Sequence, residues 1–311
     1  MVSDPITVRV PATTANLGPG FDCMGMALDV WNEVWVEEGK DPEVSIQGQG
    51  SSDLPADADN LVYRAMKHLF EHAQVDMPPL RLRCHNQIPL QRGLGSSAAA
   101  IVGGLVAADL LMSQIWGSGA PAHSKEDLLE RAAHLEGHPD NVAAALLGGL
   151  QLVVSEEGTL VTDPVPLPDD IATVLFIPQM TIATEDARKV LPSSVSREDA
   201  LYNAGRVALL VNALSTGRLD HLPLATRDRL HQPYRQKLFP AMKVIFQAAM
   251  KAGALGVFLS GSGPTILALT RGREMTVAYE MADAARKANV DGETKITKPT
   301  PQGAHPMGTR E

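Results

Sequence analysis

One stretch of this chain decides how the rest of it is interpreted: Pro89-Leu90-Gln91-Arg92-Gly93-Leu94-Gly95-Ser96-Ser97-Ala98-Ala99. Segment 80–88 before it is predicted to be a strand, and segment 98–115 after it a long helix of small residues. The two glycines let the backbone approach a ligand closely and adopt dihedral angles that a Cβ forbids. The two serines fall where the first N–H groups of the helix have no internal partner.

Those free N–H groups and the positive end of the helix dipole form a site for an anion such as phosphate. A tight strand-to-helix turn capped by serine, which needs no ligand, is the competing interpretation. The stretch is not a Walker loop, because no Lys-Ser/Thr pair follows the glycines. It is not a dinucleotide fingerprint either, because its glycine spacing differs, and this argues against an NAD-binding oxidoreductase.

Composition places the 311-residue chain among globular proteins, with 44% hydrophobic, 20% charged and only 4% aromatic residues. The net charge of −9 argues against a nucleic-acid surface. The two cysteines, Cys23 and Cys84, make no disulfide framework, and the N-terminus does not resemble a signal peptide. The longest apolar run, 98–108, is too short to span a bilayer. We therefore expect a cytoplasmic protein without a membrane partner, and the oligomeric state stays open, with a homodimer as one alternative.

The N-terminal part of the chain offers two groups of polar candidates. Segment 12–22 is expected to be a loop, because it contains two glycines and a proline, and it carries Asn16 and Asp22. Loops of this kind often hold ligand-contacting groups, but the segment also fits a simple connector. Asn60 precedes a predicted helix, 61–74, and its local sequence fits a helix cap better than a ligand contact.

Acidic side chains and a histidine follow farther along. A serine with an acid three residues later, at Ser124 and Asp127, predicts the start of a helix that carries Glu130, and most such glutamates are simply solvated. The segment His138-Pro139-Asp140-Asn141 then packs an imidazole, a carboxylate and an amide into one turn before a predicted helix, 141–147. In isolation these groups fit chemistry and helix capping equally well.

The proline-rich segment 164–168 is the predicted linker between two halves of the chain. We predict one domain at 1–160, a second at 161–300 and a disordered tail at 301–311.

The second half contributes two arginines and another glycine turn. Arg188 and Arg235 stand in distinctive contexts, although both also fit surface charges. The turn 260–264, Ser-Gly-Ser-Gly-Pro, lies between two predicted strands and cannot be a helix cap. It therefore indicates a close backbone approach, either to a ligand or to the first glycine stretch.

Three motifs thus stand in a fixed order: the polar segment near the N-terminus, P-x-x-x-G-L-G-S-S-A-A in the middle and S-G-S-G-P-T near the C-terminus. Together they resemble the GHMP kinases, the small-molecule kinases of galactose, homoserine, mevalonate and phosphomevalonate. The resemblance covers the whole chain, and its middle motif is strongly specific. Within the family, segments 10–22, 136–143 and 259–264 are most similar to the members that phosphorylate homoserine. Gln91 is a small departure, at a variable position where small residues are common.

The resemblance implies an α+β fold of two domains. The N-terminal domain would be like ribosomal protein S5 domain 2, with a left-handed βαβ unit, and the C-terminal domain would be ferredoxin-like. General rules would not have predicted that unit, because right-handed connections are overwhelmingly favoured. The resemblance also implies ATP and Mg²⁺ as cofactors and the hydroxyl of L-homoserine as the phosphoryl acceptor.

Roles for individual residues follow from the same resemblance. ATP would contact Asn60 at its adenine and, along the phosphates, Pro89, Leu90, Gln91, Arg92, Gly93, Leu94, Gly95, Ser96, Ser97, Ala98 and Ala99. Mg²⁺ would be held by Ser97 and Glu130, with Glu136 as a rival. The amino group and hydroxyl of homoserine would be surrounded by Asn16, Asp22, His138, Asp140 and Asn141. Its carboxylate would be clamped by Arg188 and Arg235, whose guanidinium forks match a planar anion. Thr184 would sit beside the transferred phosphate, and the supporting loop would be Gly261, Ser262 and Gly263.

The residue that acts on the attacking hydroxyl and the identity of the substrate each have alternatives. Either Asp140 or Asn141 would lie beside the attacking hydroxyl. We favour in-line attack without a strong base, since alignment and charge neutralisation supply much of the catalysis in phosphoryl transfer. A kinase of another small alcohol, such as mevalonate or shikimate, and a non-catalytic homologue are the competing functions. Two arginines and an acid suited to an ammonium group favour an amino-acid substrate.

Overall fold

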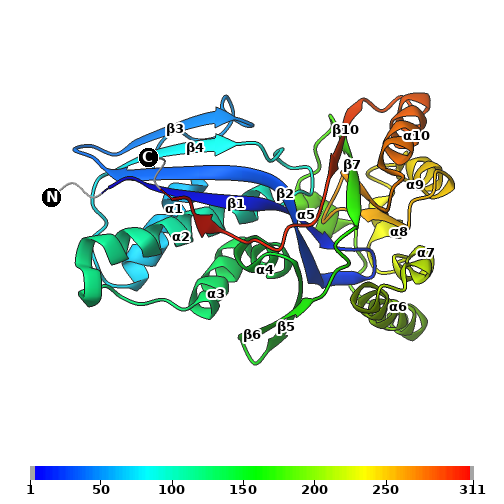
Figure 1. Cartoon of the computed structure of the whole chain (residues 1–311), viewed down its shortest axis with the longest axis horizontal. Helices are drawn as coiled ribbons and strands as arrows, with labels where there is room; N and C mark the ends of the chain where they lie inside the picture. The colour runs from blue at the N-terminus through cyan, green and yellow to red at the C-terminus, as the bar shows by residue number, and fades with distance from the viewer. Residues whose placement is uncertain (1–3, 309–311) are drawn as a thin grey trace.

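The computed structural model describes residues 4–308. Within these residues the strands form two sheets that lie one after the other along the long axis of the molecule (Figure 1). The strands are β1 (Ile6–Asn16), β2 (Gly20–Glu38), β3 (Glu43–Gly48), β4 (Leu80–Asn86), β5 (Leu150–Glu156), β6 (Thr159–Val165), β7 (Ala172–Pro178), β8 (Gly256–Leu259), β9 (Ile266–Thr270), β10 (Gly292–Thr297) and β11 (His305–Pro306). The α-helices are α1 (Leu61–His72), α2 (Ser96–Trp116), α3 (Lys125–Glu136), α4 (Asp140–Leu147), α5 (Thr184–Lys189), α6 (Arg197–Thr216), α7 (Leu222–Ala225), α8 (Gln232–Arg235), α9 (Met242–Lys251) and α10 (Glu274–Lys287).

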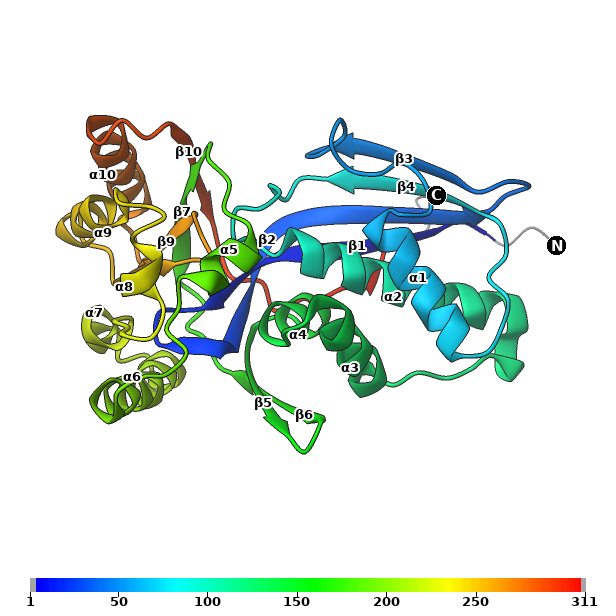
Figure 2. The ribbon, with the colours of Figure 1, turned by 180° about the vertical axis from the view of Figure 1, so that it is seen from behind.

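The first sheet has the order β11-β1-β2-β4-β3, with the hairpin β5–β6 branching from β2. Helices α1 to α4 gather on one of its faces (Figure 2). Strands β3 and β4 are parallel and are connected through α1, which makes them a βαβ unit. The packed face is apolar, so the sheet and the four helices share one core.

The prediction of a polar loop at 12–22 is wrong. Strand β1 continues to Asn16 and β2 starts at Gly20, so that only residues 17–19 remain as a turn between two long antiparallel strands. The polar residues Thr13 and Thr14 are completely buried there, because the hairpin enters the space between the two domains. The tip of the hairpin contacts the second domain, where Asn203 donates a hydrogen bond to the carbonyl of Pro19 (3.1 Å).

The predicted helix after the glycine stretch is confirmed as α2, but it begins at Ser96 and its N-cap is Gly95, whose φ is +69°. Neither serine caps the helix; both lie in its first turn. By length and composition Ser96–Gly119 is apolar enough to cross a membrane, contrary to the expected short run. Yet 61% of its most apolar window is buried inside the fold, as in the core helix of a globular protein.

The second sheet has the order β10-β7-β9-β8, and all its neighbouring strands are antiparallel. Numbered along the chain, these four strands follow the order 4-1-3-2, with helices between the first and second and between the third and fourth. This arrangement is the βαββαβ pattern of ferredoxin-like domains, so the fold predicted for the second half is confirmed. Helices α9 and α10 pack against its core.

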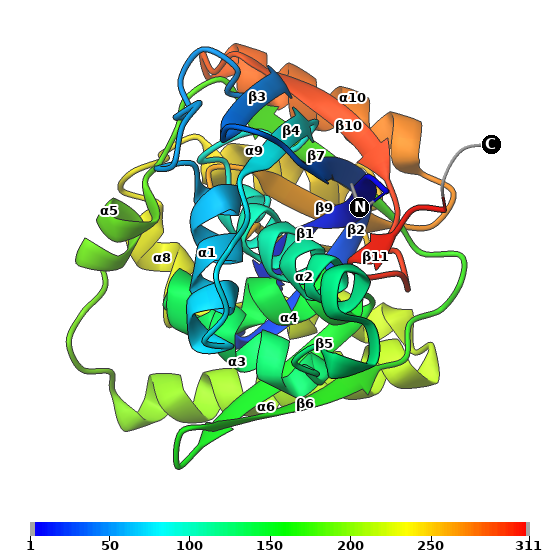
Figure 3. The same ribbon diagram turned by 90° about the vertical axis from the view of Figure 1, so that its left-hand side faces the viewer.

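The last described residues belong to the first domain, and the expected disorder of the tail is wrong for residues 301–308. Strand β11 pairs with β1 (Figure 3), and Ala304 donates to the carbonyl of Ala145 (2.8 Å). Residues 309–311 lie outside the described part. The linker also starts later than predicted, because Pro164 and Val165 still belong to β6, and the expected boundary at residue 160 falls inside that strand.

Candidate active site

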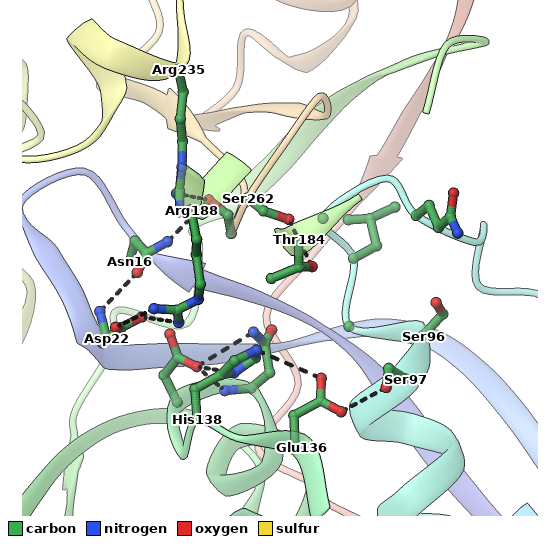
Figure 4. A pocket seen from close by; sticks show the side chains of 17 residues that line it. Asn16, Asp22, Ser96, Ser97, Glu136, His138, Thr184, Arg188, Arg235 and Ser262 are labelled. Atoms are coloured by element: carbon green, nitrogen blue, oxygen red, sulfur yellow. Dashed lines mark hydrogen bonds and ion pairs between the residues drawn. The ribbon is translucent and has the colours of Figure 1, made fainter. Parts of the chain in front are cut away.

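A cavity lies where the β1–β2 turn, the glycine stretch, the α3–α4 connection, α5, α8 and the second glycine turn meet (Figure 4). It contains every residue predicted to contact homoserine and every predicted catalytic residue. It is lined by Asn16, Asp22, Gln91, Gly93, Leu94, Gly95, Ser96, Ser97, Glu136, His138, Asp140, Asn141, Thr184, Arg188, Arg235, Gly261 and Ser262.

The two glycine turns are in direct contact. Ser260 donates to the carbonyl of Gly93 (2.6 Å), and the backbone N–H of Thr265 donates to the carbonyl of Arg92 (3.3 Å). A Cβ on Gly93 would collide with the carbonyl oxygen of Ser260. The close approach predicted for the second turn is therefore an approach to the first glycine stretch.

His138, Asp140 and Asn141 form a rigid group at the start of α4. Asp140 is 2% exposed, and its Oδ1 accepts from the backbone N–H of Asn141 (2.8 Å) and lies 3.1 Å from Nδ1 of His138. Asn141 Oδ1 accepts from the hydroxyl of Thr13 (2.8 Å). Burial lowers the pKa of His138, but the hydrogen bond and charge of Asp140 and the charge of Glu136 outweigh it, so the pKa is raised. The two interpretations of this group, helix capping and chemistry, are thus compatible: Asp140 lies in the first turn of α4, and it also faces the cavity.

Of the two glutamates considered as Mg²⁺ ligands, Glu136 and not Glu130 lies beside Ser97. Ser97 donates to Oε2 of Glu136 (2.6 Å) inside the cavity, whereas Glu130 is exposed and does not line it. The two glutamates are six residues apart on α3, which places Glu130 about 9 Å away along the helix axis and on another face. Burial raises the pKa of Glu136, and the hydrogen bond from Ser97 and the charge of His138 partly oppose this. Hydroxyl and carboxylate oxygens suit Mg²⁺, whose remaining positions water and phosphate would fill.

The two arginines occupy different environments. Arg188 binds both carboxylate oxygens of Asp22, at 2.8 and 3.0 Å, and about a third of each side chain is exposed. Arg235 is 3% exposed and forms no ion pair with a carboxylate within residues 4–308. Burial lowers the pKa of Arg235 to about 10, so it remains charged at neutral pH.

Asn16 and Thr184 complete the walls. Asn16 donates to the carbonyl of Gly261 (3.0 Å) and accepts from the backbone N–H of Asp22 (2.9 Å). Thr184 begins α5, and its hydroxyl lies 3.3 Å from that of Ser262.

Several predicted ATP contacts lie outside this cavity. The Arg92 guanidinium turns away and donates to the carbonyls of Pro178 (2.8 Å) and Gln179 (2.7 Å), which tie the glycine stretch to the second domain. Pro89 lines a separate surface pocket, whereas Ala98 and Ala99 are buried in the core.

A second, more apolar cavity adjoins the first across the glycine stretch. Asn60 lines it, but its side chain is engaged: it accepts from the N–H of Val62 (3.0 Å) and donates to the carbonyl of Pro55 (2.9 Å). The cap predicted from sequence is thus confirmed. The cavity is lined by Asn32, Leu54, Pro55, Asp59, Asn60, Leu61, Val62, Cys84, Asn86, Leu90, Gln91, Ser96, Ser97 and Ala100.

Comparison with known proteins agrees with this geometry. Residues 60–149 match the family described as GHMP kinases N terminal domain, and residues 210–289 match GHMP kinases C terminal. The chain belongs to the GHMP kinase family, whose members use ATP.

The relatives that match over nearly the full length of the chain are named homoserine kinases. A homoserine kinase of Moorella thermoacetica is 46% identical over 96% of this chain and 98% of its own length. A homoserine kinase of a Synechocystis species is 43% identical, with 96% and 97% covered. Among solved structures, homoserine kinase from Cytophaga hutchinsonii superposes with a TM-score of 0.87 at 30% identity and covers 98% of both chains. Mevalonate kinase of L. major, 16% identical with a TM-score of 0.65 over 96% of this chain and 95% of its own, shares the fold.

Proposed function

We propose that this chain is a homoserine kinase, which transfers the γ-phosphoryl group of ATP to the hydroxyl of L-homoserine and forms O-phospho-L-homoserine for threonine biosynthesis. The observation that carries the proposal is Arg235. A guanidinium that is 3% exposed, borders a cavity and lacks a carboxylate partner in the described chain is costly unless an anion binds it. The α-carboxylate of an amino acid is such an anion.

The opposite wall suits the rest of the substrate. Asp140 uses Oδ1 for its protein contacts and keeps Oδ2 for an ammonium group. Asp22 supplies a second carboxylate, which pairs with Arg188. A zwitterion can bind to both side chains, its ammonium group to Asp22 and its carboxylate to Arg188. A neutral sugar or a hydroxy acid without an amine offers no cation for these two acids.

The two adjoining cavities suit the two substrates. The apolar cavity would hold the adenine of ATP, and the phosphates would pass along Gly93 to Ser97, where the first N–H groups of α2 are free. Ser97 and Glu136 would hold Mg²⁺, which neutralises charge on the phosphates when bound. Cys84, in the apolar cavity, would contribute only packing, because burial raises the pKa of its thiol to about 12.

In the transfer itself, the homoserine oxygen forms a bond to the γ-phosphorus while the bond to the ADP oxygen breaks. Asn141 is held by Thr13 and can orient the hydroxyl, and Thr184 can donate to the moving phosphoryl group. The proton of the hydroxyl leaves to water, since Oδ2 of Asp140 faces the ammonium group. Such a reaction depends mainly on alignment and on charge neutralisation.

A coupled assay of ATP consumption with homoserine, mevalonate, shikimate and galactose tests the proposal. We expect turnover of homoserine, and Arg235→Ala should raise its KM by roughly 10- to 100-fold, the worth of a charge-assisted hydrogen bond, with the KM for ATP unchanged. Arg81→Ala, at an exposed arginine on β4, is the matched control. Turnover of another alcohol alone, binding of ATP without any turnover, or an unchanged homoserine KM in Arg235→Ala would each reject the assignment.

A further inference from the structure

Behind Arg235 lies a completely buried histidine, His231, which does not line the cavity. Its Nε2 is 2.7 Å from the carbonyl oxygen of Gly18, and its Nδ1 is 3.1 Å from Nη1 of Arg235. A carbonyl can only accept and a guanidinium can only donate. Nε2 therefore carries the hydrogen and Nδ1 is the acceptor, so both contacts require the same neutral tautomer.

We infer that His231 is a positioning residue for substrate recognition: its Nε2–H binds the β1–β2 turn, and its Nδ1 holds Arg235 so that Nη2 of that guanidinium is directed to the substrate carboxylate. The inference rests on the proposed function and assigns a role to a residue that does not touch the substrate.

The hydrogen bonds of Arg235 support this role. Its Nε donates to the carbonyl of Ala187 (3.2 Å), and its Nη1 donates to His231 and to the carbonyl of Gly261 (2.9 Å). These bonds use the hydrogens of Nε and Nη1. Nη2 has no acceptor within the described chain, so both its hydrogens remain for a ligand.

An aromatic ring joins the two arginines. The Phe21 ring stacks on His231 with a centroid distance of 5.3 Å, and the guanidinium carbons of Arg235 and Arg188 lie 5.4 and 5.7 Å from its centroid. Phe21 precedes Asp22, the partner of Arg188. The start of β2 thereby contacts both arginines through one side chain.

The position of His231 is itself fixed from both sides. Asp228 Oδ2 accepts from the backbone N–H groups of His231 (3.0 Å) and Gln232 (2.7 Å), at the start of α8. The side-chain amide of Asn203 donates to the Asp228 carboxylate (2.8 Å) and to the carbonyl of Pro19 (3.1 Å). Burial, with the nearby charge of Arg235 opposing that of Asp228, lowers the pKa of His231 to about 4, so the ring is neutral at physiological pH.

Two substitutions separate the two contacts of the ring. In His231→Asn the amide oxygen takes the place of Nδ1 and can still accept from Arg235. In His231→Gln the amide nitrogen takes the place of Nε2, which keeps the bond to Gly18 and loses the acceptor. His85→Gln, a half-exposed histidine on β4, is the matched control.

Steady-state kinetics would be measured with L-homoserine and with 3-amino-1-propanol, which keeps the amine and the hydroxyl but lacks the carboxylate. We expect His231→Gln to raise the KM for homoserine about tenfold, the worth of a hydrogen bond to a charged group. Its KM for ATP and its kcat/KM for 3-amino-1-propanol should stay within about twofold of wild type. His231→Asn should keep the homoserine KM within about threefold, and adding His231→Gln to Arg235→Ala should have no further effect.

The outcomes distinguish this inference from the proposed function. An effect of Arg235→Ala without an effect of His231→Gln would overturn the inference and leave the proposed function standing. Equal losses with both alcohols, or a raised KM for ATP, would show that His231 only supports the fold. If Arg235→Ala leaves the homoserine KM unchanged, the carboxylate site itself is misassigned.

Discussion

Replacing Gly93 by alanine tests the contact between the two glycine turns. The φ of Gly93 is +70°, and an added Cβ would collide with the carbonyl oxygen of Ser260 and lie 2.9 Å from the backbone nitrogen of Gly263. Holding alanine in the left-handed region costs about 1 kcal/mol. Overpacking against backbone that cannot rotate away adds about 1–3 kcal/mol. We therefore expect the free energy of unfolding to fall by about 2–4 kcal/mol.

Gly217 provides a matched control at the end of α6. Its φ is +71°, and no heavy atom lies within 4 Å of an added Cβ. Gly217→Ala should therefore show only the conformational cost of about 1 kcal/mol. Alanine also reduces the entropy of the unfolded chain, but by a similar amount at both sites, so this effect cancels in the comparison.

Thermal unfolding and ATP kinetics measure the two consequences. We expect Tm to fall by about 2 °C in Gly217→Ala and by roughly 5–10 °C in Gly93→Ala. The kcat/KM for ATP should fall at least about tenfold in Gly93→Ala only, because the displaced loop misplaces the N–H groups that face the phosphates. Equal losses of Tm in the two variants, or wild-type use of ATP by Gly93→Ala, would refute the reasoning.

Further predictions concern the metal, the base, a titration and the tail. Glu136→Gln should raise the Mg²⁺ concentration for half-maximal activity at least about tenfold in a metal titration, and Glu130→Gln should not. A larger effect of Glu130→Gln would identify Glu130 as the Mg²⁺ ligand. Asp140→Asn should lower kcat by less than about 100-fold, because the favoured transfer needs no strong base. A loss of several decades with an intact homoserine KM would instead identify Asp140 as the general base. Burial lowers the pKa of His138, but the contacts with Asp140 outweigh it, so the pKa is raised in the folded protein. The stabilisation of the fold by these contacts is therefore complete below the ordinary pKa of 6.5 and is lost as pH rises through the raised pKa. The Tm difference between wild type and His138→Gln should therefore shrink as pH rises above the ordinary value, and a growing difference would contradict the sign. Ending the chain at Pro299 should lower Tm by at least about 5 °C, because it removes several backbone hydrogen bonds to the first domain, and an unchanged Tm would mean that these bonds do not stabilise it.

Local patterns predicted local features well. The capping box at Ser124 and the cap at Asn60 are confirmed, because each depends on residues within one turn. The glycine spacing at 93–95 likewise marked a strand-to-helix turn, because positive φ values exclude most other residues.

Errors arose where an environment comes from distant parts of the chain. Thr13 and Thr14 look like loop residues, but they extend β1, since the second domain covers them. Residues 301–308 are held by bonds to backbone groups of the first domain, and such bonds leave no trace in the composition of the tail.

The sequence by itself determined the family, the anion-binding turn and the set of polar residues that such a site requires, because these depend on residue types at short, fixed spacings. Only the tertiary structure decided which glutamate faces Ser97, that Arg235 is buried without a carboxylate partner in the described chain, and that His231 lies in hydrogen-bond contact behind it. Those facts depend on the direction in which a helix face points and on contacts between residues more than 200 positions apart, such as His231 and Gly18. No local pattern of residues carries that information, since burial and pairing arise only when the two domains pack together.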